Sequence, residues 1–154
     1  MSEVYLEYYE SPIGLVEIGG MSTSVTSVRF VEESRQRFQS HPTVVKASRQ
    51  LAQYFEGSRR KFEVDISFAG TEFQRQVWHQ LLKVPYGHLA SYHDIARAIG
   101  RPKATRAVGA ANGQNSLAII VPCHRIIGSN GKLTGYGSGL WRKEWLLKHE
   151  GSLP

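Results

Sequence analysis

Residues 91–112 have the sequence SYHDIARAIGRPKATRAVGAAN, and this stretch decides which kind of fold the chain adopts. Apolar residues at helical spacing predict two short helices, from Ser91 to Ile99 and from Lys103 to about Asn112. The turn Gly100-Arg101-Pro102 joins them and contains a glycine, as the turn of a helix-turn-helix commonly does. The stretch therefore predicts a helix-turn-helix unit.

The second helix of this pair has small side chains on both sides. Its predicted packing face consists of Ala104, Ala107, Val108 and Ala111. The other side carries Thr105, Gly109 and Asn112, with Arg106 as its one long cation. A glycine within a helix costs about 1 kcal/mol relative to alanine, which suggests close approach to another surface. That surface is either a groove of DNA or a neighbouring helix, and the helix before it together with the basic charge favours DNA.

The composition is that of one average domain, or of one domain with a small appendage. The chain has 154 residues, of which 41% are hydrophobic, so it can bury a core without disulfides. Its 19 basic and 13 acidic residues give a net charge of +6. Such a surplus fits nucleic acid first and an anionic membrane surface second, although a merely solvated basic surface is the plain alternative.

The chain contains a single cysteine, Cys123, which excludes an internal disulfide and a cysteine-rich zinc site. The first five residues lack the features of a signal peptide, and no apolar run is long enough to span a membrane. We therefore expect an intracellular protein, cytoplasmic or associated with the nucleoid, that is not secreted.

The regions around the helix pair predict an α/β (α+β) protein with two domains. Residues 1–68 form a small domain with strands over residues 4–9, 15–18 and 26–30, a helix from Pro42 to Gly57 and a further strand over residues 61–66. Residues 69–154 form a mostly helical domain. It has a helix capped by Thr71 and Gln74, a tight turn over residues 128–131 and a last helix from Leu140 to about His149.

Cys123 follows a short apolar run that predicts a strand, and His124 and Arg125 come directly after it. A thiolate is the reactive form of cysteine, so a base or a cation is needed nearby. Successive side chains of a strand point to opposite faces, so a Cys123–His124 contact needs a break in the strand or a bridging water. Asn115 is a turn residue or holds the backbone near Cys123, and Tyr92 is a core aromatic or a phenol donor.

Several separated motifs together resemble the O6-alkylguanine-DNA alkyltransferase family, also called methylated-DNA–protein-cysteine methyltransferases. The signature Pro122-Cys123-His124-Arg125 lies within a similar stretch over residues 115–128. Further similarity covers residues 91–92, 102–109, 133–136, 143–147 and 150–151. Residues from about 70 to 151 thus resemble the catalytic domain of the family in order and spacing. The first 65 or so fit its variable N-terminal domain only in pattern.

The resemblance implies DNA repair by irreversible transfer of an alkyl group from O6-alkylguanine in duplex DNA to Cys123. The helix-turn-helix would bind in the minor groove, and the damaged guanine would flip out of the base stack into a pocket. Each molecule would act once, without a cofactor or a metal. His124 would act on Cys123 through a water, Glu150 would orient His124, Asn115 would hold the backbone, and Tyr92 would donate a proton to the guanine. Arg106 would fill the vacated place in the stack. The other residues expected at the DNA are Thr105, Ala107, Gly109, Ala110, Asn112 and Arg125, and those expected at the substrate pocket are Tyr136, Val121, Pro122, Gly137 and Ser138.

The chain departs from the family at two positions, and several properties stay open. Ser116 stands where members often have proline, and Gly137 stands where others have a serine directly after the tyrosine. We expect a monomer. The sequence leaves open whether molecules bind cooperatively along DNA, whether O4-alkylthymine is a substrate and what the N-terminal domain does.

Three rival functions are weaker than repair. A non-catalytic lesion-binding relative would lack Cys123. A helix-turn-helix regulator would leave the Cys-His-Arg arrangement unexplained. A cysteine hydrolase does not need the basic helix pair.

Overall fold

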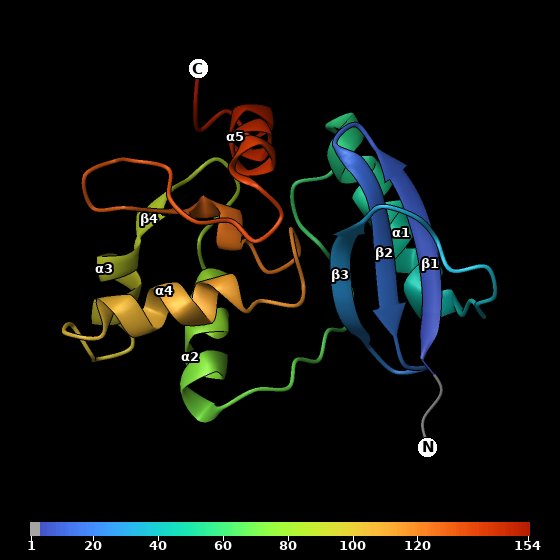
Figure 1. The fold of residues 1–154 in the computed structure, drawn as a ribbon, viewed down its shortest axis with the longest axis horizontal. Coiled ribbons are helices and arrows are strands. Elements are labelled where there is room, and N and C mark those ends of the chain that lie inside the picture. The colour runs from blue at the N-terminus through green and yellow to red at the C-terminus, as the bar shows by residue number, and fades with distance from the viewer. Residues whose placement is uncertain (1–3) are drawn as a thin grey trace. The chain divides into compact units, whose positions relative to one another are not determined.

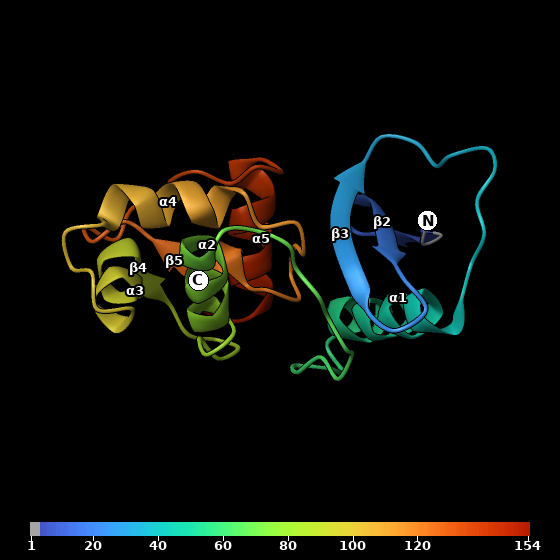
Figure 2. The same cartoon turned by 90° about the horizontal axis from the view of Figure 1, so that it is seen from below.

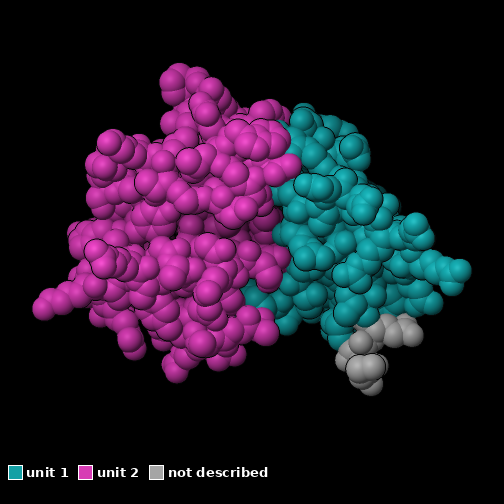
Figure 3. All heavy atoms as spheres, viewed as in Figure 1, with its two compact units in different colours: residues 1–68 teal, residues 69–154 magenta. Residues whose placement is uncertain are grey.

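The computed structural model describes residues 4–154, which form two compact units: unit 1 up to residue 68 and unit 2 from residue 69 (Figures 1 and 3). Both units combine helices with short strands, so the predicted α/β fold class is confirmed. Over the described residues, every helix is too short or too polar to cross a bilayer.

Unit 1 is a three-stranded antiparallel sheet with one helix on one of its faces, as the two views in Figures 1 and 2 show. The elements are β1 (Tyr5–Ser11), β2 (Gly14–Gly20), β3 (Val25–Val31) and α1 (Pro42–Glu56). Alternating apolar residues of β2 such as Val16 and Ile18 are fully buried, as is Leu51 of α1, which packs on the sheet. The three predicted strands and the helix are confirmed, with Pro42 in the first turn of α1 and Gly57 as its left-handed C-cap.

The further strand predicted over residues 61–66 is wrong. Only an isolated bridge between Val25 and Ile66 forms there. The Gln50 side chain of α1 accepts a hydrogen bond from the Glu63 backbone N–H at 2.9 Å and donates to the Glu63 carbonyl at 3.3 Å. A side chain therefore satisfies the backbone groups that a strand partner would otherwise bind, and the segment stays irregular.

Unit 2 is built from four helices, a 3₁₀ turn and a two-stranded parallel pair. The elements are α2 (Glu72–Leu81), β4 (Ala90–Ser91), α3 (Tyr92–Ala98), α4 (Thr105–Gly113), η1 (Cys123–Arg125), β5 (Ile126–Ile127) and α5 (Leu140–His149). Helices α2, α3 and α4 pack on one another, and Trp78 of α2 donates a hydrogen bond to the Ala111 carbonyl of α4 at 2.8 Å.

The predicted helices of unit 2 are confirmed, and their caps follow the sequence. Thr71 and Gln74 form the expected capping box at α2, and Ser91 forms a second one with Asp94 at α3. The predicted tight turn is also present, because Gly131 donates a backbone hydrogen bond to Gly128 at 2.9 Å.

The strand predicted to lead into Cys123 is wrong. Residues 117–121 form tight turns, and Ile119 has a left-handed φ of 71°. Such a φ is strained for a β-branched residue. The strain is sustained because Asn115 holds both ends of the turn: its Oδ1 accepts from the Leu117 N–H at 2.9 Å and its Nδ2 donates to the Val121 carbonyl at 2.9 Å. The chain then enters η1 rather than a sheet.

Candidate active site and DNA-facing helix

Cys123 opens η1 and lies almost fully buried, with 6% of its surface exposed. The Asn115 Nδ2 that holds the preceding turn is also 3.2 Å from the Cys123 sulfur and donates to it. Burial raises the pKa of the Cys123 thiol, whereas the Asn115 hydrogen bond and the charge of Lys143 act in the opposite direction. Asn115 therefore lies at a turn and binds the backbone before Cys123, as expected, and it also donates to the sulfur, which the sequence did not indicate.

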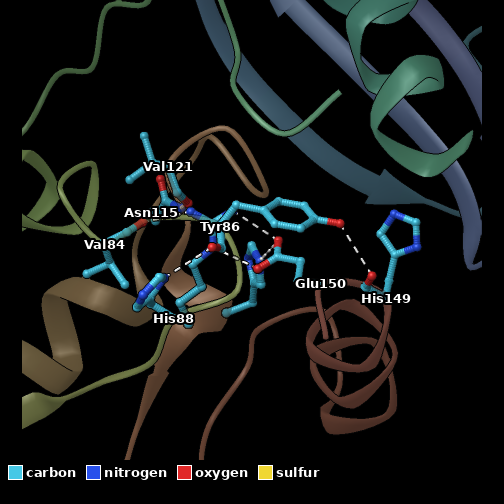
Figure 4. A network of polar contacts seen from close by, with 9 residues as sticks. Val84, Tyr86, His88, Asn115, Val121, His149 and Glu150 are labelled. Atoms are coloured by element: carbon cyan, nitrogen blue, oxygen red, sulfur yellow. Dashed lines mark hydrogen bonds and ion pairs between the residues drawn. The ribbon is translucent and has the colours of Figure 1, made fainter. Parts of the chain in front are cut away.

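His124, Arg125 and Glu150 form a buried charge cluster behind the thiol. The Glu150 carboxylate accepts hydrogen bonds from His124 Nε2 at 2.7 Å and from Arg125 Nε and Nη2 at 2.8 Å and 3.0 Å. Arg125 Nη1 also donates to the Val84 carbonyl at 2.7 Å. Figure 4 shows Glu150 within this network, beside the contact between the Tyr86 hydroxyl and the His149 carbonyl.

The cluster keeps Glu150 ionised and His124 neutral. Burial by itself would raise the pKa of Glu150, but the hydrogen bonds and charges of His124 and Arg125 hold it far below its usual range. Burial lowers the pKa of His124, against the opposing effect of Glu150. With Nε2–H directed at the carboxylate, the lone pair of the imidazole is on Nδ1. That atom is buried and has no hydrogen-bond partner among residues 4–154, so it is available as a base.

A cavity of about 50 Å³ adjoins the Cys123 thiol. It is lined by Asn112, Gly113, Asn115, Ala118, Cys123, Gly135, Tyr136, Gly137 and Ser138. Two buried polar atoms of this lining, Tyr136 OH and Asn112 Oδ1, have no hydrogen-bond partner within the described part of the chain. A space of this size holds one or two waters and not a nucleobase. The lining, which includes the segment from Gly135 to Ser138, must therefore move before a base can enter.

Tyr92 lies beside this segment and not in the lining of the cavity. Its hydroxyl donates to the Thr134 carbonyl at 3.2 Å and accepts from the Thr134 hydroxyl at 3.3 Å. A Cβ placed on Gly135 would lie 3.9 Å from the same hydroxyl. The Tyr92 hydroxyl thus lies next to the cavity, but its proton is donated to the Thr134 carbonyl.

Helix α4 presents an exposed stripe that differs from the predicted one. Val108 and Ala111 are buried as expected, whereas Ala107, assigned to the packing face, is exposed. The exposed stripe consists of Arg106, Ala107, Ala110 and Gly113, with Thr105 and Gly109 half-buried beside it. A Cβ on Gly109 would only reach ordinary contact with the Tyr92 ring, so no close neighbour within the chain requires the glycine.

Three groups of predicted site residues lie elsewhere than expected. Asn112 was expected at the DNA but is 4% exposed, and its side chain donates to the Cys123 carbonyl at 3.3 Å. Arg125 was also expected at the DNA, but its guanidinium binds the Glu150 carboxylate and the Val84 carbonyl. Val121 and Pro122 are buried and are not among the residues that line the cavity. Tyr136, Gly137 and Ser138 do line it.

Lys143 is the charged residue near the site that the sequence analysis missed. It lies on α5 with none of its surface exposed. A lysine in a helix is normally exposed, so the residue type by itself does not indicate burial. The signal was its place on the inward face of α5, four residues before the buried Leu147.

Among the described residues, no three His, Cys, Asp or Glu side chains come together as a metal site would require.

Two family models match the chain, one in each unit. The model described as "6-O-methylguanine DNA methyltransferase, DNA binding domain" matches residues 72–152. The model described as "6-O-methylguanine DNA methyltransferase, ribonuclease-like domain" matches residues 4–68. Together they account for nearly the whole chain.

Known proteins are similar over the same length. The methylated-DNA–protein-cysteine methyltransferase of Methanosarcina acetivorans is 47% identical over 155 residues, which cover 97% of this chain and 99% of the relative. The crystal structure of the Mycobacterium tuberculosis O6-methylguanine methyltransferase superposes with a TM-score of 0.88 at 44% identity, covering 97% of this chain and 94% of that one. A structure of the M. tuberculosis protein in complex with DNA has the same TM-score at 47% identity, covering 96% and 93%.

Both family models, the relatives and the site geometry agree. The chain therefore belongs to the 6-O-methylguanine DNA methyltransferase family, and it is a DNA-binding enzyme that repairs DNA by transferring an alkyl group to a protein cysteine.

Proposed function

We propose that Cys123 is the alkyl acceptor and that the substrate is O6-alkylguanine in duplex DNA. The observation that carries this proposal is the arrangement around the thiol. The only cysteine of the chain adjoins a cavity and lies in the same 3₁₀ turn as a neutral histidine whose free nitrogen is buried. Residues 69–154 would thus supply both the DNA contacts and the chemistry.

The first step is removal of the thiol proton. No direct hydrogen bond joins Cys123 to His124 within the described residues, so the proton passes through a bridging water to His124 Nδ1. The resulting imidazolium is stabilised by Glu150, whose carboxylate is already ionised and held by Arg125. The Asn115 amide donates to the sulfur and stabilises the thiolate.

In the second step the thiolate attacks the carbon of the alkyl group. A carbon–sulfur bond forms, the bond between that carbon and O6 breaks, and the electron pair goes to the guanine. Tyr92 protonates the guanine ring as this charge develops. Its hydroxyl must first exchange the Thr134 carbonyl for the base. The product on the protein is a stable thioether, so each molecule reacts once.

Base flipping is part of the proposal because the cysteine is buried. A base stacked in duplex DNA cannot reach a thiol that is 6% exposed behind a cavity lining. The exposed stripe of α4 would enter the minor groove, with Arg106 in the place that the base vacates and small neighbours on either side. We propose a monomer as the active form. An intracellular, reducing location would keep the acceptor thiol available.

The proposal is tested by locating the transferred group. After incubation with duplex DNA that contains one O6-methylguanine, mass spectrometry should find one methyl group per protein, on the peptide that contains Cys123. The variant Cys123→Ala should transfer nothing and still bind the duplex. An unmodified Cys123 peptide in folded, DNA-bound protein would exclude the proposal, and so would methylation at another residue.

A further inference from the structure

Arg142 of α5 binds one wall of the cavity beside Cys123, and the proposed mechanism gives it no role. Its Nη1 donates a hydrogen bond to the Ser138 carbonyl at 2.7 Å. Ser138 lines the cavity, whereas Arg142 lies outside the lining, in the first turn of α5. The bond therefore connects the cavity wall, residues 135–138, to a helix.

Trp141 extends this contact toward the end of the wall. The Arg142 guanidinium lies over the indole ring of Trp141, with its Cζ 4.5 Å from the ring centroid. The same ring packs on Gly139, because a Cβ placed there would be 3.1 Å from Trp141 Cδ1 and 3.2 Å from Nε1. Gly139 also has a positive φ of 102°, which suits glycine. We call the contacts of Trp141 and Arg142 with residues 138–139 the clasp.

The clasp lies at the surface and is therefore able to open. Trp141 is 55% exposed, Arg142 is half-buried, and Gly135 and Gly137 of the wall are exposed. Contacts of this kind open at a lower cost in free energy than those of a packed core. The glycines at 135, 137 and 139 leave the backbone free to rotate when the wall moves.

Opening of the wall must precede the reaction. The cavity of about 50 Å³ does not hold a nucleobase, so the substrate binds only to a form in which the lining has moved. A substrate that binds only the open form loses affinity in proportion to the rarity of that form. A larger alkyl group displaces the wall further, so the clasp opposes it more strongly than it opposes a methyl group.

We propose that Arg142, stacked on Trp141, is a specificity-determining residue that holds the cavity wall closed and thereby favours small alkyl groups over large ones. This inference rests on the proposed role of Cys123 as the acceptor of alkyl groups from guanine. Arg142 takes no part in the transfer itself. It acts through the Ser138 carbonyl.

Two other roles of Arg142 predict different results. If Arg142 bound a phosphate of DNA, its loss would slow transfer from duplex DNA and leave the reaction with free bases unchanged. If it only stabilised α5, its loss would slow the reaction of every substrate by the same factor. Neither role changes the preference between alkyl groups.

The test compares free O6-benzylguanine with free O6-methylguanine, so that contacts with DNA do not contribute. The measured quantity is the second-order rate constant of Cys123 alkylation, followed by mass spectrometry. We expect Arg142→Met to raise the ratio of the benzyl to the methyl rate constant about fivefold, equivalent to about 1 kcal/mol. Arg142→Lys, which keeps a charged donor, should remain closer to the parent. Trp141→Ala should raise the ratio as well, and it replaces Arg142→Met if that variant does not fold.

A second measurement reports on the wall without any substrate. The Gly139 N–H donates to the Tyr136 carbonyl at 2.9 Å, so its hydrogen exchange, followed by NMR, reports the opening of this turn. We expect this amide to exchange about fivefold faster in Arg142→Met, in line with the rate ratio. Lys148→Gln removes an exposed cation from the same helix and should change neither the ratio nor the exchange.

An unchanged or lower ratio in the folded variants would overturn the inference, and so would unchanged exchange of the Gly139 amide. Failure of the acceptor role appears separately, as a Cys123 peptide of the parent protein that stays unmodified after incubation with O6-methylguanine in duplex DNA. In that case the amide exchange still shows whether Arg142 holds the wall.

Discussion

Glu150 supplies the negative charge that pairs with Arg125 and His124 in the site. Its carboxylate is fully buried and binds both His124 and Arg125, so its ionisation is tied to the folded state. The pKa of Glu150 is depressed in the folded protein. The stabilisation from this carboxylate is therefore complete above the unfolded pKa and is lost progressively as the pH falls from the unfolded pKa to the lower folded pKa. The lowered pKa of His124 acts in the same direction, because protonation of the buried imidazole is unfavourable.

We predict that Glu150→Gln lowers the free energy of unfolding at pH 7 by about 3 kcal/mol, since it leaves Arg125 buried without its anion. The same change should flatten the pH dependence of stability below about pH 5, where the parent loses stability because its unfolded chain takes up a proton at Glu150 that the folded protein does not. Urea denaturation at a series of pH values measures both effects. Glu144→Gln, an exposed position on the same helix, is the control. A Glu150→Gln variant that keeps the acid sensitivity of the parent would contradict the prediction.

At the scale of elements, the regular parts of the fold were predictable because their signals are local. Pro42 and Gly57 mark the ends of α1, and Thr71 with Gln74 caps α2. Two of the predicted strands do not form, because side chains hydrogen-bond to the backbone groups that a neighbouring strand would otherwise bind. Gln50 binds Glu63, and Asn115 folds residues 117–121 into turns. A pattern of alternating apolar residues contains no information about such competitors.

The site was predictable in part for a related reason. Cys123, His124, Asn115 and Glu150 were found through the motif, and the structure brings them together. Arg125 and Asn112 were misplaced, since a cation beside a motif and an amide on a short helix both resemble DNA contacts in sequence. Only the tertiary structure shows that Glu150 binds the first and that the second faces Cys123.

Helix α4 leads to a prediction about Arg106, which lies in its exposed stripe. We expect Arg106→Ala to slow transfer from duplex DNA about tenfold, equivalent to about 1.4 kcal/mol, because the flipped state loses the side chain that fills the stack. Reaction with the free base O6-methylguanine should change little. Single-turnover rates with both substrates make the comparison. Arg97→Ala removes the same charge from α3 and serves as the control. Equal losses on duplex and free base would rule out the role of Arg106 in base flipping.

For the whole molecule, the reaction changes a packed interior. The cavity of about 50 Å³ beside Cys123 has room for a methyl group but not for an aromatic one. A group larger than the cavity must displace the segment from Gly135 to Ser138, and overpacking of this kind costs about 1–3 kcal/mol. The reacted protein should therefore be less stable, by an amount that grows with the alkyl group.

We predict that benzylated protein melts at least about 3 °C below the unreacted protein, and that methylated protein lies between the two. Thermal unfolding of the three forms, prepared with O6-benzylguanine or O6-methylguanine, tests the order. Cys123→Ala treated with the same reagents should show no shift. Benzylated and methylated protein with the same melting temperature would contradict the link to cavity size.

Because Glu150 lies at the end of α5, it is synthesised after the other residues of the site. A ribosome makes the DNA-facing helix α4 first, then the thiol, and only later the carboxylate that completes the relay. Until residue 150 leaves the exit tunnel, His124 and Arg125 lack their shared anion. Under the proposed mechanism, Cys123 then also lacks an efficient base, and a nascent chain that already carries the cysteine is not ready to react. We therefore predict that the thiol becomes competent only after α5 has been translated and folded against η1.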